Sequence, residues 1–264
     1  MERPGRTGSF EVVFVAQDGV EQRVPWAFMP DVVVELGRPV RSFPSYHGQR
    51  NYPGWYWSAT MGALLGFESW VERDHLVALD FDPAVVRVVS QPFWLWWSTP
   101  EGKRRRHAPD FLVLLEDGSA EGAVLVLDSR PLELIAEEDR AAFDAMDRAC
   151  ALLDWRYAVW DRLDGVVVAN QRWLAAYRHP RCYNEPVAGR LLEVFTRPRS
   201  LMEGAELAGD PLGTLPVLYH LLWTHRLLAD LALALSDRSI LRGAPDAGRA
   251  HDSVFVKSGA RRRG

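Results

Sequence analysis

Two short apolar segments, each with an aspartate at one end, constrain the fold of this chain more than any other feature. The first runs from Asp110 to Leu115, and the second runs from Ala123 to Asp128. Between them, Glu116-Asp117-Gly118-Ser119 has the composition of a turn. Antiparallel pairing of the two segments places Asp110 and Asp128 next to each other at one end of a hairpin. The sequence therefore predicts a β-sheet with two carboxylates at one edge.

A predicted helix before this hairpin provides a third candidate carboxylate. The pattern from Glu68 to Phe81 is helical, with Leu76 and Leu79 on one face. Glu72 shares that face, where an ionised carboxylate needs a metal or another partner. Glu68 lies four residues earlier on the same face and is the alternative acid. Both acids can instead be solvated residues of the first turn that stabilise the helix N-terminus.

Carboxylates and a cation around one phosphate are the components of metal-dependent phosphodiester hydrolysis. The carboxylates hold a divalent ion, Mg²⁺ or alternatively Mn²⁺, which neutralises charge on the phosphorus centre and on the leaving oxygen. In this interpretation Glu72, Asp110 and Asp128 bind the metal. Arg130 lies two residues beyond Asp128, so an extended chain projects it to the same side, toward the same phosphate. These four residues form the predicted catalytic site.

Basic residues are clustered although the net charge is −4. Lys103, Arg104, Arg105 and Arg106 are consecutive and are predicted to contact the DNA backbone. Residues 246–264 are predicted to be a basic, disordered tail that can also contact phosphate. The plainer interpretation is a solvated hairpin tip for the first cluster and a solvated tail for the second.

The 264 residues are enough for one or two globular domains, and we favour two. Residues 1–37 are predicted to be an N-terminal β segment with a hairpin around Gln17-Asp18-Gly19. The nuclease domain is predicted at residues 38–180, and its first part, to about residue 66, is predicted to be irregular. The other elements expected in this domain are strands at residues 85–90, 93–97, 157–160 and 166–169 and a helix at residues 137–153.

The strand at residues 93–97 contains Phe93-Trp94-Leu95-Trp96-Trp97. We expect these rings to be buried on both faces of a central strand, and base stacking is the alternative role.

The segment 181–245 is predicted to form a small helical domain of the winged-helix type. Three short helical stretches are followed by an alternating segment that reads as a β-ribbon. A plain helical appendage is the alternative. The predicted helices lie at residues 187–195, 201–208 and 215–223, and the alternating segment at residues 227–235.

Several protein classes lack support in the sequence. No apolar run reaches the length of a membrane helix, because Asp230 interrupts Leu227 to Leu235. The N-terminus has no secretory signal pattern, and Cys150 and Cys182 form no ligand-spaced set. We therefore expect a cytoplasmic protein with no membrane contact and no zinc site.

Four motifs follow one another in a defined order. They are Glu72 with Asp80-Phe81-Asp82-Pro83, Ser90-Gln91-Pro92, His107-Ala108-Pro109-Asp110-Phe111, and Val126-Leu127-Asp128-Ser129-Arg130-Pro131. This ordered set resembles the TnsA-type endonuclease subunits of heteromeric transposases, which belong to the PD-(D/E)xK nuclease superfamily. The similarity covers residues 40–180.

The resemblance implies a restriction-endonuclease-like mixed sheet flanked by helices. It implies that Glu72, Asp110 and Asp128 bind the metal and that Arg130 replaces the family's lysine. Lysine with a depressed pKa can help to activate water, whereas arginine stays protonated and can only orient and stabilise charge.

The partners implied by the resemblance are double-stranded DNA at transposon ends, a DDE-type transposase subunit that cuts the other strands, and a regulatory ATPase. Two alternatives stay open. One is a catalytically degenerate subunit that serves as a DNA-binding or scaffold component, and the other is a stand-alone restriction or repair nuclease.

Overall fold

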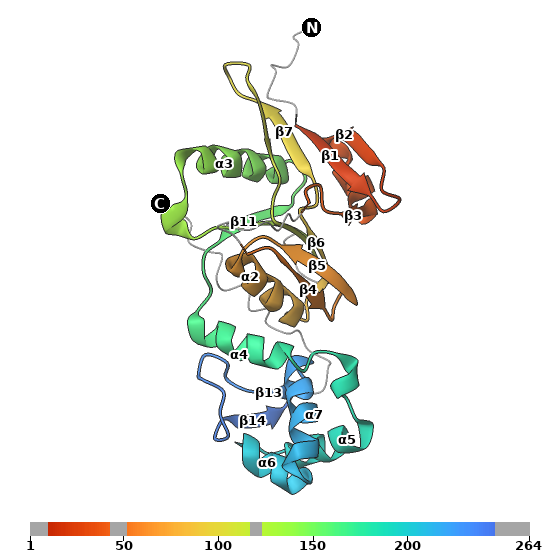
Figure 1. Cartoon of the computed structure of the whole chain (residues 1–264), viewed down its shortest axis with the longest axis vertical. Coiled ribbons are helices and arrows are strands. Elements are labelled where there is room, and N and C mark those ends of the chain that lie inside the picture. The colour runs from red at the N-terminus through yellow and green to blue at the C-terminus, as the bar shows by residue number, and fades with distance from the viewer. Residues whose placement is uncertain (1–9, 43–51, 117–122, 246–264) are drawn as a thin grey trace. The chain divides into compact units, whose positions relative to one another are not determined.

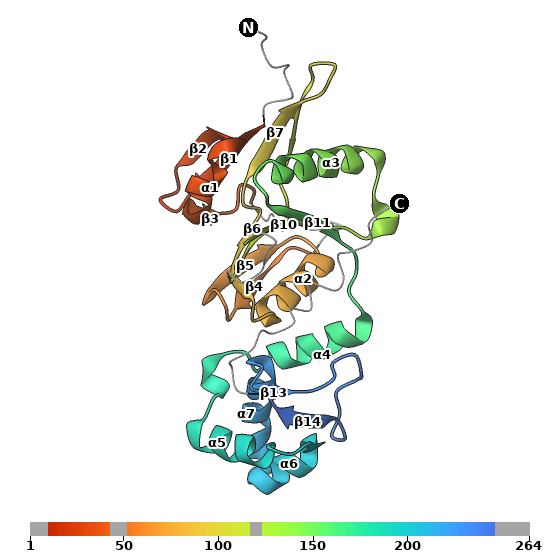
Figure 2. The same cartoon turned by 180° about the vertical axis from the view of Figure 1, so that it is seen from behind.

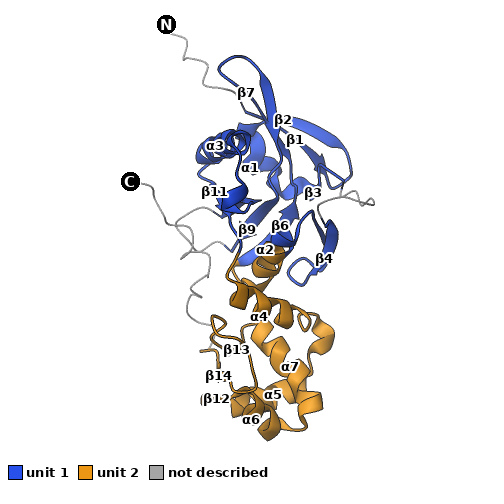
Figure 3. Cartoon of the chain, turned by 60° about the vertical axis from the view of Figure 1, so that its left-hand side comes forward, with its two compact units in different colours: residues 1–73, 85–162 blue, residues 74–84, 163–264 orange. Residues whose placement is uncertain are grey.

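The computed structural model describes residues 10–42, 52–116 and 123–245, and it forms the mixed α/β fold that the sequence predicts (Figure 1). The chain divides into two compact units (Figure 3). Unit 1 comprises residues 1–73 and 85–162, and unit 2 comprises residues 74–84 and 163–264. In the part of the chain that is described, no helix combines the length and the apolar character needed to cross a bilayer.

Two sheets and a separate hairpin form the framework of unit 1. Its strands are β1 (Glu11–Ala16), β2 (Glu21–Pro25), β3 (Leu36–Arg38), β4 (Gly54–Ser58), β5 (Ala63–Phe67), β6 (Val85–Ser90), β7 (Trp94–Ser98), β8 (Arg104–His107), β9 (Phe111–Leu115), β10 (Val124–Ser129) and β11 (Arg156–Trp160). One sheet has the order β2-β1-β7-β8, with β3 also paired to β1, and the other has the order β11-β10-β9-β6. Strands β4 and β5 form a two-stranded sheet with no further strand among the described residues.

The predicted hairpin that carries the two aspartates is confirmed. Strands β9 and β10 are antiparallel, with Phe111 opposite Leu127. One further step in this register places Asp110 opposite Asp128, and paired residues point to the same side of a sheet. Helix α3 (Glu137–Ala151) then connects β10 to the parallel strand β11 and lies alongside β11 (Figure 2). This crossover brings a third strand next to the acidic end of β10.

The N-terminal strands belong to the core of unit 1. Strand β1 pairs with β7 as well as with β2, and a short helical segment that includes α1 (Met29–Val32) follows β2. Trp26 is 2% exposed, and its indole Nε1 donates to the backbone oxygen of Ala149 in α3 at 2.5 Å. Its ring also meets Phe93 and Trp155 edge to face. The N-terminal β segment was predicted to be separate from residues 38–180. In the structure its strands belong to the same compact unit as most of those residues.

Two predictions of local structure in unit 1 are modified by the structure. The segment predicted as irregular up to residue 66 contains the hairpin β4–β5, in which the aromatic residues of β4 lie opposite glycine and leucine residues of β5. Arg104, Arg105 and Arg106 lie in strand β8, and the hairpin tip is formed by the residues between Thr99 and Lys103. Three other predicted segments lie wholly or partly outside the described residues: the turn after Glu116, residues 43–51 of the segment predicted as irregular, and the tail 246–264.

Within residues 163–245, unit 2 contains the three predicted short helices and one more. Its helices are α4 (Gly165–Ala175), α5 (Glu185–Val194), α6 (Leu201–Ala208) and α7 (Pro211–Trp223), and its short strands β12 (Arg199–Ser200), β13 (Leu227–Leu228) and β14 (Ile240–Gly243) pair in the order β12-β14-β13. Residues 74–84 of unit 2 include most of helix α2 (Trp70–Phe81), which begins in unit 1.

Two strand predictions in unit 2 are wrong. Residues 166–169 are helical, because the Asp164 carboxylate caps the helix by accepting from the backbone N–H groups of Val166 and Val167. β-Branched valines favour strands only weakly against such a cap. In the alternating segment 227–235, only Leu227–Leu228 forms a strand. The remainder is held by Asn170, whose amide donates to the carbonyl oxygens of Leu231 and Leu233.

The packing of α5 against α6 gives a stability prediction. A Cβ at Gly204 would lie 2.0 Å from Cζ of Phe195, a side chain that is 1% exposed. Gly204→Ala therefore has to displace a buried ring, and we expect it to lower the free energy of unfolding by about 1–3 kcal/mol. Thermal denaturation measures this loss. Gly213→Ala is the control, because no atom lies within 4 Å of its Cβ position; an equal loss in both variants would contradict the packing explanation.

Candidate active site

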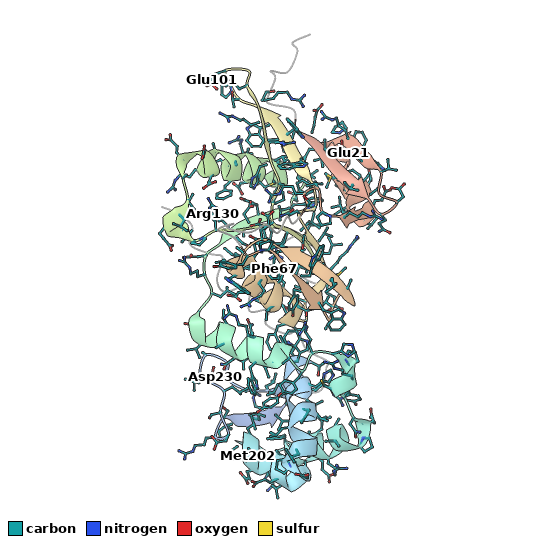
Figure 4. The ribbon with its side chains drawn as sticks, in the orientation of Figure 1. Glu21, Phe67, Glu101, Arg130, Met202 and Asp230 are labelled. Atoms are coloured by element: carbon teal, nitrogen blue, oxygen red, sulfur yellow. The ribbon has the colours of Figure 1, made fainter. Side chains whose placement is uncertain are left out.

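A cavity of ≈ 370 Å³ in unit 1 contains all four residues predicted to be catalytic. Glu72, Asp110, Asp128 and Arg130 all line it. They come from the first turn of α2, the residue before β9, the end of β10 and the residue after β10. Figure 4 shows Arg130 below the start of α3. Segments that are far apart in the sequence therefore meet in one small volume.

Of the predicted DNA-binding run, only Arg106 lines this cavity. Arg104 and Arg106 share one side of β8, whereas Arg105 points to the other side. Lys103 precedes the strand, and its backbone N–H donates to Thr99 at the turn. The four basic residues therefore have different surroundings, although they are consecutive.

The carboxylate of Asp110 is anchored across the hairpin. Its Oδ2 accepts from the backbone N–H of Ser129 at 2.7 Å. The carbonyl oxygen of Asp110 accepts from the backbone N–H of Gln91 at 2.8 Å, which extends the pairing between β9 and β6. Both contacts fix the residue at the strand ends.

Asp128 is 3% exposed and has two side-chain partners. The Nε2 of His107 lies 3.0 Å from Oδ1 and 2.9 Å from Oδ2, and the hydroxyl of Tyr157 donates to Oδ2 at 2.7 Å. Burial and the negative charge of Asp128 raise the pKa of Tyr157, so its hydroxyl stays protonated. Sequence reasoning assigned no role to Tyr157, because only the register between β10 and β11 places it beside Asp128.

Glu72 acts as a helix cap and also faces the cavity. Its Oε1 accepts from the hydroxyl of Ser69 at 2.9 Å, and its Oε2 accepts from the backbone N–H of Glu68 at 2.7 Å. The hydroxyl oxygen of Ser69 in turn accepts from the backbone N–H of Glu72, as the side chain of an N-cap serine does. However, Glu72 is 7% exposed and is therefore not a solvated first-turn acid. Capping fixes its carboxylate in the cavity wall.

Glu68, the alternative helix acid, lies at the same cavity but is neutralised. Its Oε2 accepts from Arg41 at 2.9 Å. Arg41 was not identified from the sequence, since it lies 27 residues before Glu68 in a segment without periodicity.

The environment of the cavity disfavours negative charge on two of the acids. Burial is the largest effect on Glu72 and raises its pKa to about 7, although the contacts to Glu68 and Ser69 oppose the shift. Burial also raises the pKa of Asp110 well above its usual range, and the charges of Glu72 and Asp128 add to this effect. Acids with raised pKa values in a concave site are typical of functional sites. A bound cation would relieve this electrostatic cost.

Arg130 lies at the rim of the cavity. Its guanidinium donates to Oδ2 of Asp139 at 3.1 Å, and its side chain is 46% exposed. The same oxygen of Asp139 accepts from the backbone N–H of Ala136, so the acid also caps α3. The backbone N–H of Arg130 donates to the carbonyl oxygen of Trp160. Arg130 is therefore held by its main chain, while nearly half of its side chain is exposed.

Gln91, a residue of the second motif, has an unusual conformation beside Asp110. Its φ of 44° lies in the left-handed region, and the residue is 1% exposed. Neither atom of its side-chain amide has a hydrogen-bond partner in the structure. The left-handed backbone and the buried amide without a hydrogen-bond partner both lower the stability of the folded state. Such destabilising features are typical of residues in functional sites.

No protein-family model matches the chain, and no curated protein matches it. The assignment of a function therefore depends on the site itself.

The donor set of the cavity suits a hard divalent cation. Carboxylate oxygens are the ligands that Mg²⁺ prefers, and two of the acids here have raised pKa values. The geometry is not that of a completed metal site: within the described residues, no group of three or more His, Cys, Asp or Glu side chains is positioned to hold a metal ion. Metal binding would require Asp128 to share the oxygens that now accept from His107 and Tyr157.

Proposed function

We propose that this chain is the metal-dependent endonuclease subunit of a heteromeric transposase, which hydrolyses phosphodiester bonds at transposon ends. The observation that carries the proposal is the convergence of Glu72, Asp110 and Asp128 with Arg130 on one cavity. The raised pKa values of Glu72 and Asp110 support it, because such acids gain from a bound cation. The ordered motifs of the sequence provide the link to transposition, with a DDE-type transposase and a regulatory ATPase as partners.

The fold details belong to the same proposal. The sheet β11-β10-β9-β6, with α3 alongside β11, supports a restriction-endonuclease-like core. In unit 2, four helices and the short strands β12, β14 and β13 support a winged-helix-like domain.

Each residue of the proposed site has a distinct role. Asp110, Asp128 and Glu72 would hold the metal, with Glu72 contributing from the capped end of α2. When bound, Mg²⁺ would supply an activated water and neutralise charge on the leaving oxygen. Arg130 donates to the phosphate and stabilises its developing charge. His107 and Tyr157 keep the Asp128 carboxylate oriented.

A second candidate function is a catalytically degenerate subunit that binds DNA as a scaffold. It is favoured by the contacts to Asp128, whose oxygens are already engaged by His107 and Tyr157. It is also favoured by arginine at position 130, which cannot activate water by losing a proton.

A cleavage assay with variants of Arg130 separates the two functions. The purified protein, mixed with its transposase partner and duplex DNA that carries the transposon ends, should cut with Mg²⁺ or Mn²⁺ and should stop when EDTA is added. We expect Arg130→Ala to lower the cleavage rate by about 10²-fold, since one charge-stabilising donor is lost. Arg130→Lys should retain most of the activity. Cleavage that is absent with every metal would favour the scaffold, whereas equal cleavage by all three proteins would remove Arg130 from the catalytic site.

A further inference from the structure

One face of the sheet β2-β1-β7-β8 carries arginines beside tryptophans. Trp94 and Trp96 share a side of β7, because side chains alternate along a strand. The register of β7 and β8 pairs Trp96 with Arg106 and thus places Arg106 on this side. The other side of β7 faces the core, where Leu95 is 0% exposed. The prediction that this run is buried on both faces is therefore wrong for Trp94 and Trp96, which are only half-buried.

The guanidinium groups lie over the indole rings at cation–π distances. Arg106 lies 4.2 Å from the ring centroid of Trp94 and 5.3 Å from that of Trp96. Arg104 and Arg23 lie 4.9 Å and 5.7 Å from the ring of Trp96. At the other end, Arg41 lies 5.7 Å from the ring of Trp94. We call this set the Arg-Trp stripe: Arg23, Arg41, Trp94, Trp96, Arg104 and Arg106.

The stripe is continuous with the cavity. Trp94, Arg106 and Arg41 line the cavity, whereas Trp96 and Arg104 lie farther along the hairpin toward its tip. Figure 4 shows that tip at Glu101. The arginine side chains of the stripe thus form a row from the solvent-exposed hairpin to the cavity that contains Asp110 and Glu72.

The charge of the stripe is positive. Its four arginines face two carboxylates: Glu11 pairs with Arg23 and Arg104, and Glu68 pairs with Arg41. The side chains of Arg23 and Arg104 are 50% and 55% exposed, so their remaining N–H groups reach solvent. A guanidinium beside a ring keeps its donors in a fixed plane, so it loses less conformational entropy when it binds a phosphate.

We propose that the Arg-Trp stripe binds the phosphate backbone of the duplex DNA strand that enters the cavity. This inference rests on the proposed function and names the residues that guide its substrate. Because the arginines lie over the indole rings, the stripe suits phosphate contact better than base stacking. Recognition by such contacts is independent of base sequence and is sensitive to salt.

The test compares arginines on the two sides of one strand. Binding of fluorescently labelled duplex DNA to the full chain is measured by anisotropy over a series of salt concentrations. We expect Arg104→Ala to weaken binding and to reduce the slope of log affinity against log salt by roughly 1, and the double variant Arg23→Ala/Arg104→Ala by roughly 2. Arg105→Ala removes the same charge from the opposite side and should change the slope by less than half as much. Equal effects of Arg104→Ala and Arg105→Ala would overturn the proposal.

Two further variants test the roles of charge and stacking. Glu11→Gln removes the carboxylate that pairs with two arginines of the stripe, and it should increase DNA affinity by about 3- to 10-fold. Trp96→Leu keeps every charge, and it should decrease affinity because Arg23 and Arg104 lose the ring that they lie over. Unchanged affinity in Glu11→Gln, or salt slopes of the arginine variants equal to that of the wild type, would overturn the proposal.

The failure of this inference is distinguishable from the failure of the proposed function. If metal-dependent cleavage is absent but the stripe variants change the slope, the nuclease assignment fails and the stripe stands. If cleavage occurs and the stripe variants bind as the wild type does, the stripe fails alone.

Discussion

Asp110→Asn is expected to abolish DNA cleavage, with a loss of at least about 10³-fold, equivalent to roughly 4 kcal/mol in the barrier. The asparagine side chain has the same shape, and its oxygen can still accept from the backbone N–H of Ser129. It provides no negative charge for a divalent cation in the cavity. The measurement is the single-turnover rate of end cleavage at saturating DNA and Mg²⁺, in the presence of the transposase partner.

The same substitution should stabilise the protein without metal. Burial and the charges of Glu72 and Asp128 raise the pKa of Asp110, so an ionised Asp110 is unfavourable in the folded state. A neutral side chain removes this cost, and Asp110→Asn should therefore have a higher Tm than the wild type in EDTA above neutral pH. A variant that gains stability and loses activity identifies a residue that is kept for function.

Glu68→Gln is the matched control for Asp110→Asn. Glu68 lines the same cavity, but its charge is already paired with Arg41. We expect its cleavage rate to stay within about threefold of the wild-type rate, or about 0.7 kcal/mol. Wild-type cleavage by Asp110→Asn would remove Asp110 from the catalytic site, and a large loss in Glu68→Gln would show that Glu68 is the acid contributed by the helix.

The parts of the site that the sequence predicts are those set by local pattern. Asp110 and Asp128 lie at the ends of two strands that are joined by a short connection. A single hairpin register therefore determines their proximity. Glu72 lies on the inward face of a helix that has a regular period. In each case, the pattern of a single hairpin or a single helix is enough to place the side chain.

The parts that the sequence does not predict depend on contacts between distant segments. Tyr157 reaches Asp128 through a parallel pairing across α3, and Arg41 reaches Glu68 from a segment without periodicity. A signal for the exposed face of β7 was present, because Arg104 and Arg106 alternate as Trp94 and Trp96 do. Without the β7–β8 register, this alternation cannot be assigned to a shared face.

The second large effect is on stability, and it follows from the pKa of Glu72. This pKa is about 7 in the folded protein, above the ordinary value of 4.5, so the folded state holds a proton that the unfolded state releases. The contribution is fully present below about pH 4.5 and is lost as the pH rises through about 7. We therefore expect the protein in EDTA to lose on the order of 3 kcal/mol of folding free energy across this window. Denaturant unfolding at several pH values measures the loss.

Mg²⁺ should reverse this loss, because it binds the ionised form of the acids. At a concentration 100 times its dissociation constant, a ligand of the folded state adds about 2.7 kcal/mol of stability. The gain should be large at pH 8 and small at pH 5.5, where the proton on Glu72 competes with the metal. Glu72→Gln should flatten the pH dependence and should remove most of the effect of Mg²⁺, whereas Glu68→Gln should retain both. In a degenerate scaffold, stability would show the pH dependence caused by Glu72 but would not respond to Mg²⁺. The metal titration at pH 8 therefore separates a nuclease from a scaffold that keeps the fold and does not bind the metal.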